Sequence, residues 1–203
     1  MPPKPKFTRD EVVEVALKLV SEKGMDALTA RELGERLGSS ARPIFTAFRN
    51  MEELMGEVRN AAMRKYDAFV GSAVDYTPAF KRFGTQMVLF AIEEPKLFQL
   101  LFMRENDGAG DFASVAERLG PTRGLCIDAI TADYGLNPEE ANAFFEHMWV
   151  FTYGLSVLCA TGMCRFGEVE INVILGREFM GMMSLMKHGS WNAPTPRPVL
   201  QNG

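Results

Sequence analysis

Apolar positions recur at helical spacing along most of the chain, and the alternating β-branched runs that mark strands are absent. In the first segment, apolar residues stand at i, i+3, i+4 and i+7: Val13, Ala16, Leu17 and Val20. Such a stripe forms one buried helical face and needs a partner to pack on. The pattern therefore predicts an all-α protein.

Three pairs of residues with capping-box spacing predict where helices begin. In a capping box, a Ser, Thr or Asn side chain and a Glu three residues later bond each other's backbone N–H. The pairs are Thr8 with Glu11, Thr29 with Glu32, and Asn50 with Glu53. We expect a helix after each pair, and we expect the helix after Asn50 to be long and to run to about Val74.

Glycines and a proline set the other boundaries in this region. Gly24 is expected to end the first helix, and Gly38 closes the second only nine residues after its cap. A third short helix begins near Ser40, because Pro43 is tolerated in a first turn. Its apolar side is expected to consist of three residues: Ile44, Phe45 and Phe48.

Two short helices joined by a tight turn, over about residues 29 to 47, have the length and spacing of a helix-turn-helix. Arg42 is the best candidate to read a base, because its planar fork can pair with guanine O6 and N7. Lys4 and Arg9 could also reach the DNA backbone or the minor groove. The predicted DNA-contacting residues are Lys6, Thr29, Ser39, Ser40, Arg42, Thr46 and Arg49.

The net charge of −4 is unusual for a DNA-binding protein until it is divided along the chain. Residues 1–66 hold 12 Lys and Arg against 10 Asp and Glu, whereas residues 67–203 hold 10 against 16. A basic first part and an acidic second part indicate two roles. A plain three-helix bundle with solvated arginines is the alternative interpretation of the first part.

Helical patterns continue through the larger second part, at about 78–94, 95–104, 111–119, 121–134, 138–163 and 167–188. Residues 106–110 form the clearest loop, and the proline-rich tail is expected to be mobile. Several helices are rich in aromatic residues and Met, which line adaptable apolar pockets. The predicted pocket residues are Met87, Phe90, Phe98, Phe102, Trp149 and Tyr153. The alternative is that these side chains are simply core.

The last two helices are apolar over much of their circumference, so a monomer would struggle to cover them. Their apolar residues include Leu155, Leu158, Val173, Ile174, Phe179, Met180, Met183 and Leu185. Two helices from each of two subunits would form a four-helix bundle with two-fold symmetry. Gly176 and Gly181 would let the helices approach closely. We therefore expect a homodimer.

Several classes of chemistry lack their sequence signals. Neither His147 nor His188 has a Glu three residues before it, and no phosphate-binding loop, nucleophile elbow or zinc spacing is present. Cys126, Cys159 and Cys164 are expected to be buried thiols. We expect no catalytic residue, metal or cofactor, no membrane span and no signal peptide, and a protein that stays in the cytoplasm.

Residues 8–58 resemble the DNA-binding domain of the TetR/AcrR family of transcriptional regulators. The resemblance rests on four stretches: Glu22 to Gly24, Leu28 to Gly38, Phe45 to Phe48, and Asn50 to Leu54. The chain departs from the family at Phe45, where Tyr is usual, at Ala47, often His, and at Met51, commonly a phosphate-contacting Lys. Loss of phosphate contacts would weaken DNA affinity, for which Arg42 and Arg49 could compensate.

The resemblance implies a helix-turn-helix domain at 1–50, a helical ligand-binding and dimerisation domain at 51–190, and a flexible tail at 191–203. It also implies a repressor that a small apolar or aromatic ligand releases from a palindromic operator in double-stranded DNA. Trp149, Tyr153 and Gly154 look like the tryptophan-histidine-glycine motif of one family subgroup, with Tyr in place of His. An adaptor that binds DNA weakly and acts through a protein partner is the alternative.

Overall fold

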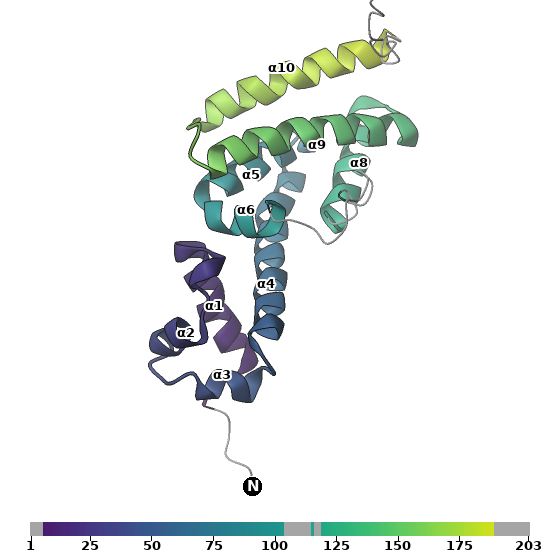
Figure 1. Cartoon of the computed structure of the whole chain (residues 1–203). Helices are drawn as coiled ribbons and strands as arrows, with labels where there is room; N and C mark the ends of the chain where they lie inside the picture. Colours follow the sequence, from purple (N-terminus) through teal and green to yellow (C-terminus); the bar gives the residue numbers. More distant parts are fainter. Residues whose placement is uncertain (1–5, 104–114, 116–118, 189–203) are drawn as a thin grey trace, which may run out of the picture.

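The computed structural model describes residues 6–103, 115 and 119–188, and these residues form helices and turns without strands (Figure 1). The all-α prediction is confirmed. The predicted helix over 111–119 falls almost wholly outside the described residues, as do Lys4, the loop at 106–110 and the tail from Gly189.

The first part of the chain folds as a bundle of short helices at one end of the long helix α4 (Figure 1). Its elements are α1 (Arg9–Lys23), the 3₁₀ turn η1 (Met25–Ala27), α2 (Ala30–Arg36), α3 (Arg42–Ala47) and α4 (Met51–Gly71). Leu19, Leu33, Ile44 and Leu54 from the four helices are fully buried together. The short α2 and α3 are thus fixed by their shared core, because helices of this length are unstable alone.

The three predicted capping pairs form to different extents. Thr8 and Glu11 make the complete box. Thr29 and Asn50 accept the backbone N–H three residues later, as expected, but their glutamates do not reciprocate. Glu32 instead binds Lys23, at 2.6 Å, and Glu53 accepts the backbone N–H of Arg49, at 2.8 Å. The predicted boxes at 29–32 and 50–53 are therefore half-formed, because stronger partners bind the two carboxylates.

The larger part of the chain is a stack of helices at the other end of α4 (Figure 1). It contains η2 (Ser72–Asp75), α5 (Ala79–Glu93), α6 (Pro95–Phe102), α8 (Pro121–Tyr134), α9 (Pro138–Ala160) and α10 (Glu168–Lys187). The helix α5 lies in the middle and packs on α4, α6, α8, α9 and α10. These bounds lie close to the predicted ones, although α4 ends at Gly71, before the predicted Val74, where the chain tightens into η2.

The helix α4 connects the two parts, and a second contact joins them beside it. Leu54 and Val58 pack with the first three helices, whereas Tyr66 and Val70 pack with the larger part. At the corner between α5 and α6, the Glu94 carboxylate accepts a hydrogen bond from Ser21 of α1, at 2.5 Å, and pairs with Lys65 of α4. The predicted boundary between residues 50 and 51 thus falls at the start of a helix that packs with both parts.

The helix α9 is long and apolar enough to cross a membrane, by length and composition alone. It nevertheless packs on α5, α8 and α10, and it contains buried polar residues, Thr152 and Ser156. These contacts are those of a core helix in a helical bundle.

Candidate nucleic-acid interface and internal cavity

The turn between α2 and α3 is compact because two glycines allow it. A Cβ built on Gly34 would lie 3.0 Å from the carbonyl carbon of Ser40 and 3.1 Å from the backbone nitrogen of Ala41. Gly38 has a φ of +61°, which L-residues with a side chain rarely adopt. The backbone N–H of Ser39 then donates to the carbonyl of Gly34, at 2.9 Å. The turn therefore places α3 directly against α2.

The predicted DNA-contacting residues lie at the surface, most of them around this turn. Ser39 is half-buried and the others are exposed: Lys6, Thr29, Ser40, Arg42, Thr46 and Arg49. The ammonium group of Lys6 donates to the hydroxyl of Ser39, at 3.2 Å, so the N-terminal arm lies close to the start of α3. Among the described residues, no side chain pairs with the Arg42 guanidinium, which is free to bind an external acceptor.

One apolar residue of α3 is not where the sequence indicated. Ile44 and Phe48 are buried, as expected, but the Phe45 side chain is 50% exposed. The helix α3 has only six residues, so one narrow face contacts the core and Phe45 falls outside it. This exposed ring lies on the same short helix as Arg42 and Thr46. It therefore belongs to the candidate interface rather than to the core.

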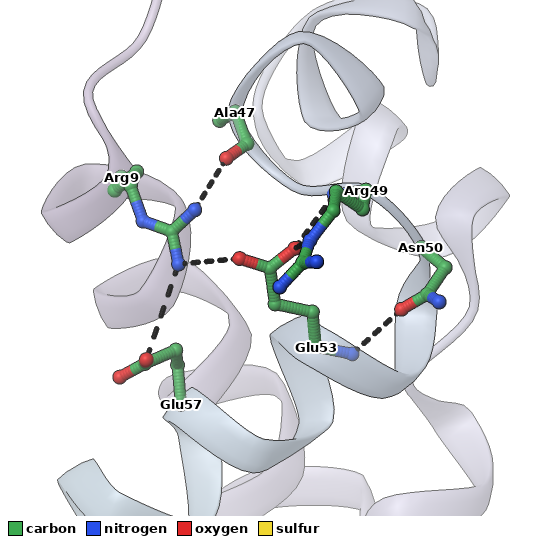
Figure 2. Close-up of polar contacts among 6 residues, drawn as sticks. All are labelled: Arg9, Ala47, Arg49, Asn50, Glu53 and Glu57. Atoms are coloured by element: carbon green, nitrogen blue, oxygen red, sulfur yellow. Dashed lines mark hydrogen bonds and ion pairs between the residues drawn. The ribbon is translucent and has the colours of Figure 1, made fainter.

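Arg9, which the sequence offered as a contact to DNA, binds within the domain instead (Figure 2). Its guanidinium donates to the carbonyl of Ala47, at 2.6 Å, and pairs with Glu53, at 2.9 Å. It also stacks on the Phe48 ring, 4.2 Å from the centroid. Arg9 therefore ties α1 to the end of α3 and the start of α4, and that expectation for Arg9 is corrected.

The carboxylate of Glu53 is the common partner in this cluster (Figure 2). The backbone N–H of Arg49 and the guanidinium of Arg9 hold the pKa of Glu53 below its usual value. The Arg49 guanidinium also lies 3.3 Å from this carboxylate, yet its side chain is 90% exposed. Arg49 can thus leave this pair to meet a phosphate, because exposed ion pairs are weak.

A cavity of about 300 Å³ lies inside the larger part, between α4, α5, α8, α9 and α10. Apolar side chains form most of its wall, among them Tyr66, Phe83, Met87, Phe145, Met148 and Trp149. This volume is at the lower end of the range for small-molecule sites. The cavity therefore suits a compact, mainly apolar ligand.

The predicted pocket residues divide into two groups. Met87 and Trp149 line the cavity. The other four pack with one another and with Tyr66 behind the wall: Phe90, Phe98, Phe102 and Tyr153. The Tyr153 hydroxyl donates to the carbonyl of Phe102, at 2.9 Å, and its ring stacks on Trp149. Those four are therefore core aromatics that support the cavity wall, as the alternative interpretation held.

Several of the cavity residues that the sequence analysis missed are small or polar. Lys81, Gly84, Thr122, Thr152 and Asn172 come from four different helices. No single segment of the chain groups them, so periodicity gave no signal for them. Only the packing of α5 against α8, α9 and α10 brings them together.

The predicted dimer face contains residues of two kinds. Leu155, Phe179 and Met183 are buried within the protein and are removed from that face. Val173, Met180 and Leu185 are exposed on α10, together with Val150 on α9. His147 of α9 and Glu178 of α10 form an ion pair of 2.8 Å, so His147 has a partner at the surface. Val173 and Met180 lie seven residues apart and so share one face of α10, and we call the exposed Val150, Val173 and Met180 the apolar strip of α9 and α10.

The three cysteines are free thiols. Cys126 and Cys159 are buried, and burial raises the pKa of both, whereas Cys164 is only partly buried because it follows the end of α9. Within the described ranges, no cluster of three His, Cys, Asp or Glu residues could hold a metal ion.

The compact α2–α3 unit, the exposed face of α3 and the long α4 define a helix-turn-helix protein with a second helical domain. Residues 12–58 match the family model described as bacterial regulatory proteins, tetR family. The chain is also 29% identical over 104 residues to the tetracycline repressor protein class A from transposon 1721 of Escherichia coli. That match spans 51% of this chain and 44% of the repressor. The N-terminal part of the chain is therefore similar to regulators of the TetR family.

Proposed function

We propose that this protein is a repressor that binds a palindromic operator as a homodimer and leaves it when a small apolar molecule enters the cavity. The observation that supports DNA binding best is the exposed face of α3, where Arg42 has no partner among the described side chains. The relative is named a tetracycline repressor, which supports the repressor role. Such a regulator would act in the cytoplasm.

In this proposal, α3 enters the major groove and the surrounding groups position it. Arg42 and Thr46 would face base edges, while Arg49 and the arm at Lys6 would meet phosphates. Thr29 lies at the N-terminus of α2, where backbone N–H groups favour an anion. The Arg9 cluster fixes the angle of α3, because it ties both α1 and α4 to the carbonyl at the end of α3.

A homodimer follows from the apolar strip on α9 and α10. Met180 is 63% exposed and Val173 is 46% exposed. Neighbouring exposed apolar residues of this kind often mark a protein–protein interface. A second copy related by two-fold symmetry would cover both strips at once and would present two copies of α3 to two half-sites. The symmetry of the dimer would thus match a palindromic operator.

The cavity supports the ligand-responsive part of the proposal. Tyr66 and Val70 of α4 line its wall, and Glu53 at the other end of α4 is joined through Arg9 to the carbonyl of Ala47 in α3. A ligand that binds one arrangement of α4 better than another shifts the population toward it. The alternative, an adaptor that acts only through a protein partner, predicts a filled core at this position, so the cavity argues against it.

The test is fluorescence anisotropy with a duplex that the protein selects from genomic fragments, at two salt concentrations. Arg42→Ala should lower specific affinity by about 5- to 150-fold, the effect of losing one bidentate base contact. Arg64→Ala, which removes an equal charge from an exposed position in the second half of α4, should change affinity little. Weak binding without sequence preference in the wild type, or equal losses in both variants, would contradict the proposed DNA-binding mode.

A further inference from the structure

The charged group in the lining of the cavity is a cation. Among the described residues that line it, Lys81 is the only one with a charged side chain at neutral pH, and no Asp or Glu lines the wall. Lys81 is exposed and lies on α5, where its ammonium group is 4.9 Å from the centroid of the Phe179 ring. Phe179 also lines the cavity. The positive charge is therefore held at the mouth, above an apolar wall.

This charge has no counter-ion within the part of the chain that the structure describes, and the neighbouring residue shows the contrast. Arg82, the next residue on α5, pairs with Glu168 of α10. No carboxylate among the described residues pairs with Lys81, and its ammonium group lies over the Phe179 ring. An unpaired cation at the edge of an apolar cavity attracts an incoming anion.

Asn172 of α10 lies at the same mouth and supplies a second donor. Its side-chain oxygen accepts a hydrogen bond from Thr85, at 2.7 Å, which leaves the amide NH₂ group for another acceptor. Lys81 and Asn172 thus come from two facing helices and both line the cavity. Together they can bind the two oxygens of a carboxylate or a similar anionic group.

Two of the hydroxyl groups in the lining are already in use. The Thr122 hydroxyl donates to the Asp67 carboxylate, at 3.1 Å, and the Thr152 hydroxyl donates to the carbonyl of Met148, at 2.7 Å. Each hydroxyl has a single proton, so neither can also donate to a ligand. Most of the remaining wall is apolar, and a ligand acceptor that faces apolar side chains has no partner, which costs free energy. The interior therefore selects an apolar body.

We propose that the effector is an organic anion with a single acidic head group on a compact apolar body. Its head group lies between Lys81 and Asn172, and its body fills the space beside Met87, Met148 and Trp149. This inference rests on the proposed ligand-responsive function and names the class of ligand for the same cavity.

The test uses isothermal titration calorimetry with probes that share a body and differ in charge. Decanoate and 1-naphthylacetate are each compared with their neutral amides, and decylamine provides a cation. In the wild type, each acid should bind at least about 10-fold more tightly than its amide. In Lys81→Met this preference should fall below about 2-fold, whereas Lys18→Met, which removes an exposed lysine from α1, should retain it.

A cavity-filling variant separates this inference from the proposed function. Gly176 lines the cavity and has open space where a Cβ would be, so Gly176→Leu should block every probe without strain. Gly124→Leu on α8 is the matched control, because Gly124 is exposed and outside the lining. Equal binding of acid and amide, or a preference that survives Lys81→Met, would overturn the anionic class but leave the cavity's role. Binding by no probe, or binding that leaves DNA affinity unchanged, would overturn both.

Discussion

Arg9 joins three helices through one guanidinium. It contacts the last carbonyl of α3, two carboxylates of α4 and the Phe48 ring. The N–H groups of the guanidinium bind acceptors that the fold holds in place, and the Phe48 ring covers one face of the guanidinium. Arg42 and Lys81 have the same charge but lack such partners among the described residues. The surroundings of a cation therefore decide whether it supports the fold or binds a ligand.

Replacing Arg9 should weaken both folding and DNA binding. Arg9→Ala leaves the Ala47 carbonyl and the Glu53 carboxylate without a partner, and it uncovers Phe48, so we expect a loss of about 1–2 kcal/mol in the free energy of unfolding. The measurement is chemical denaturation, followed by DNA titration at a temperature where the variant is folded. Arg31→Ala is the control, because the Arg31–Glu35 pair is largely exposed and should contribute under about 0.5 kcal/mol. Equal effects of the two substitutions would refute the structural role of Arg9.

At the residue scale, local signals could be predicted and distant partners could not. The hydroxyl of Thr8 and the carboxylate of Glu11 are three residues apart, so their spacing alone predicts the box that forms. The acceptor of Arg9 at Ala47 is separated by 38 residues, and no sequence period connects them. For the same reason Lys81 and Asn172 were missed, because packing alone brings them to one cavity.

The corner between α2 and α3 depends on close backbone approach. Gly34 is buried in α2, and the backbone of Ser40 and Ala41 crosses directly over it. A side chain at this position would push α3 away from α2, even though glycine itself is a weak helix former. The helix-turn-helix therefore depends on a missing side chain as much as on the buried Leu33 and Ile44.

Gly34→Val should destabilise this corner. The added methyl groups meet backbone atoms that cannot rotate away, and overpacking of this kind costs about 1–3 kcal/mol. Gly56→Val in α4 is the matched control, because the space around Gly56 is open, and it should leave stability unchanged or slightly increased. Denaturation midpoints of the two variants give the comparison. A Gly34→Val protein as stable as the wild type would show that the corner adapts by moving.

The bounds of the helices could be predicted closely from periodicity and caps. Which face of each helix is buried, and against what, could be predicted less well. The range predicted for α8 is the observed one, Pro121–Tyr134, because Pro121 and Gly135 mark its ends. Phe45 and Phe179 show the opposite outcome. Phe45 was expected in the core and is exposed, and Phe179 was expected on a dimer face and is buried against Phe80 and Phe144. An aromatic residue on a helix indicates burial somewhere, but not against which neighbour.

The whole molecule has two ends with different surfaces. One end presents the exposed α3, and the opposite end presents the apolar strip of α9 and α10 (Figure 1). Dimerisation at the second end would leave the first end free for DNA. The N-terminal surplus of positive charge and the negative charge of the rest agree with this separation.

A charge placed in the apolar strip should disrupt the dimer. Met180→Glu puts a carboxylate on each side of the two-fold axis, and we expect the dimer dissociation constant to rise at least about 10-fold. Sedimentation equilibrium over a range of concentrations measures this constant. Leu125→Glu is the control, since Leu125 is also a large exposed apolar residue but is on a different helix, α8. A monomeric wild type, or a dimer unchanged by Met180→Glu, would place the interface elsewhere.

The helix α4 has the geometry of a lever. Tyr66, at the cavity, is separated from Asn50, at the corner with α3, by 16 residues, which is about 24 Å of helix at 1.5 Å per residue. A tilt of about 5° at the cavity would move the Asn50 end by about 2 Å, which changes the separation of two copies of α3 by up to about 4 Å. Half-sites on DNA are spaced by a helical turn of about 34 Å. A movement of this size would therefore place the two copies of α3 out of register with the two half-sites. If the proposed function holds, a ligand needs to supply only a small local displacement, because the length of α4 enlarges it.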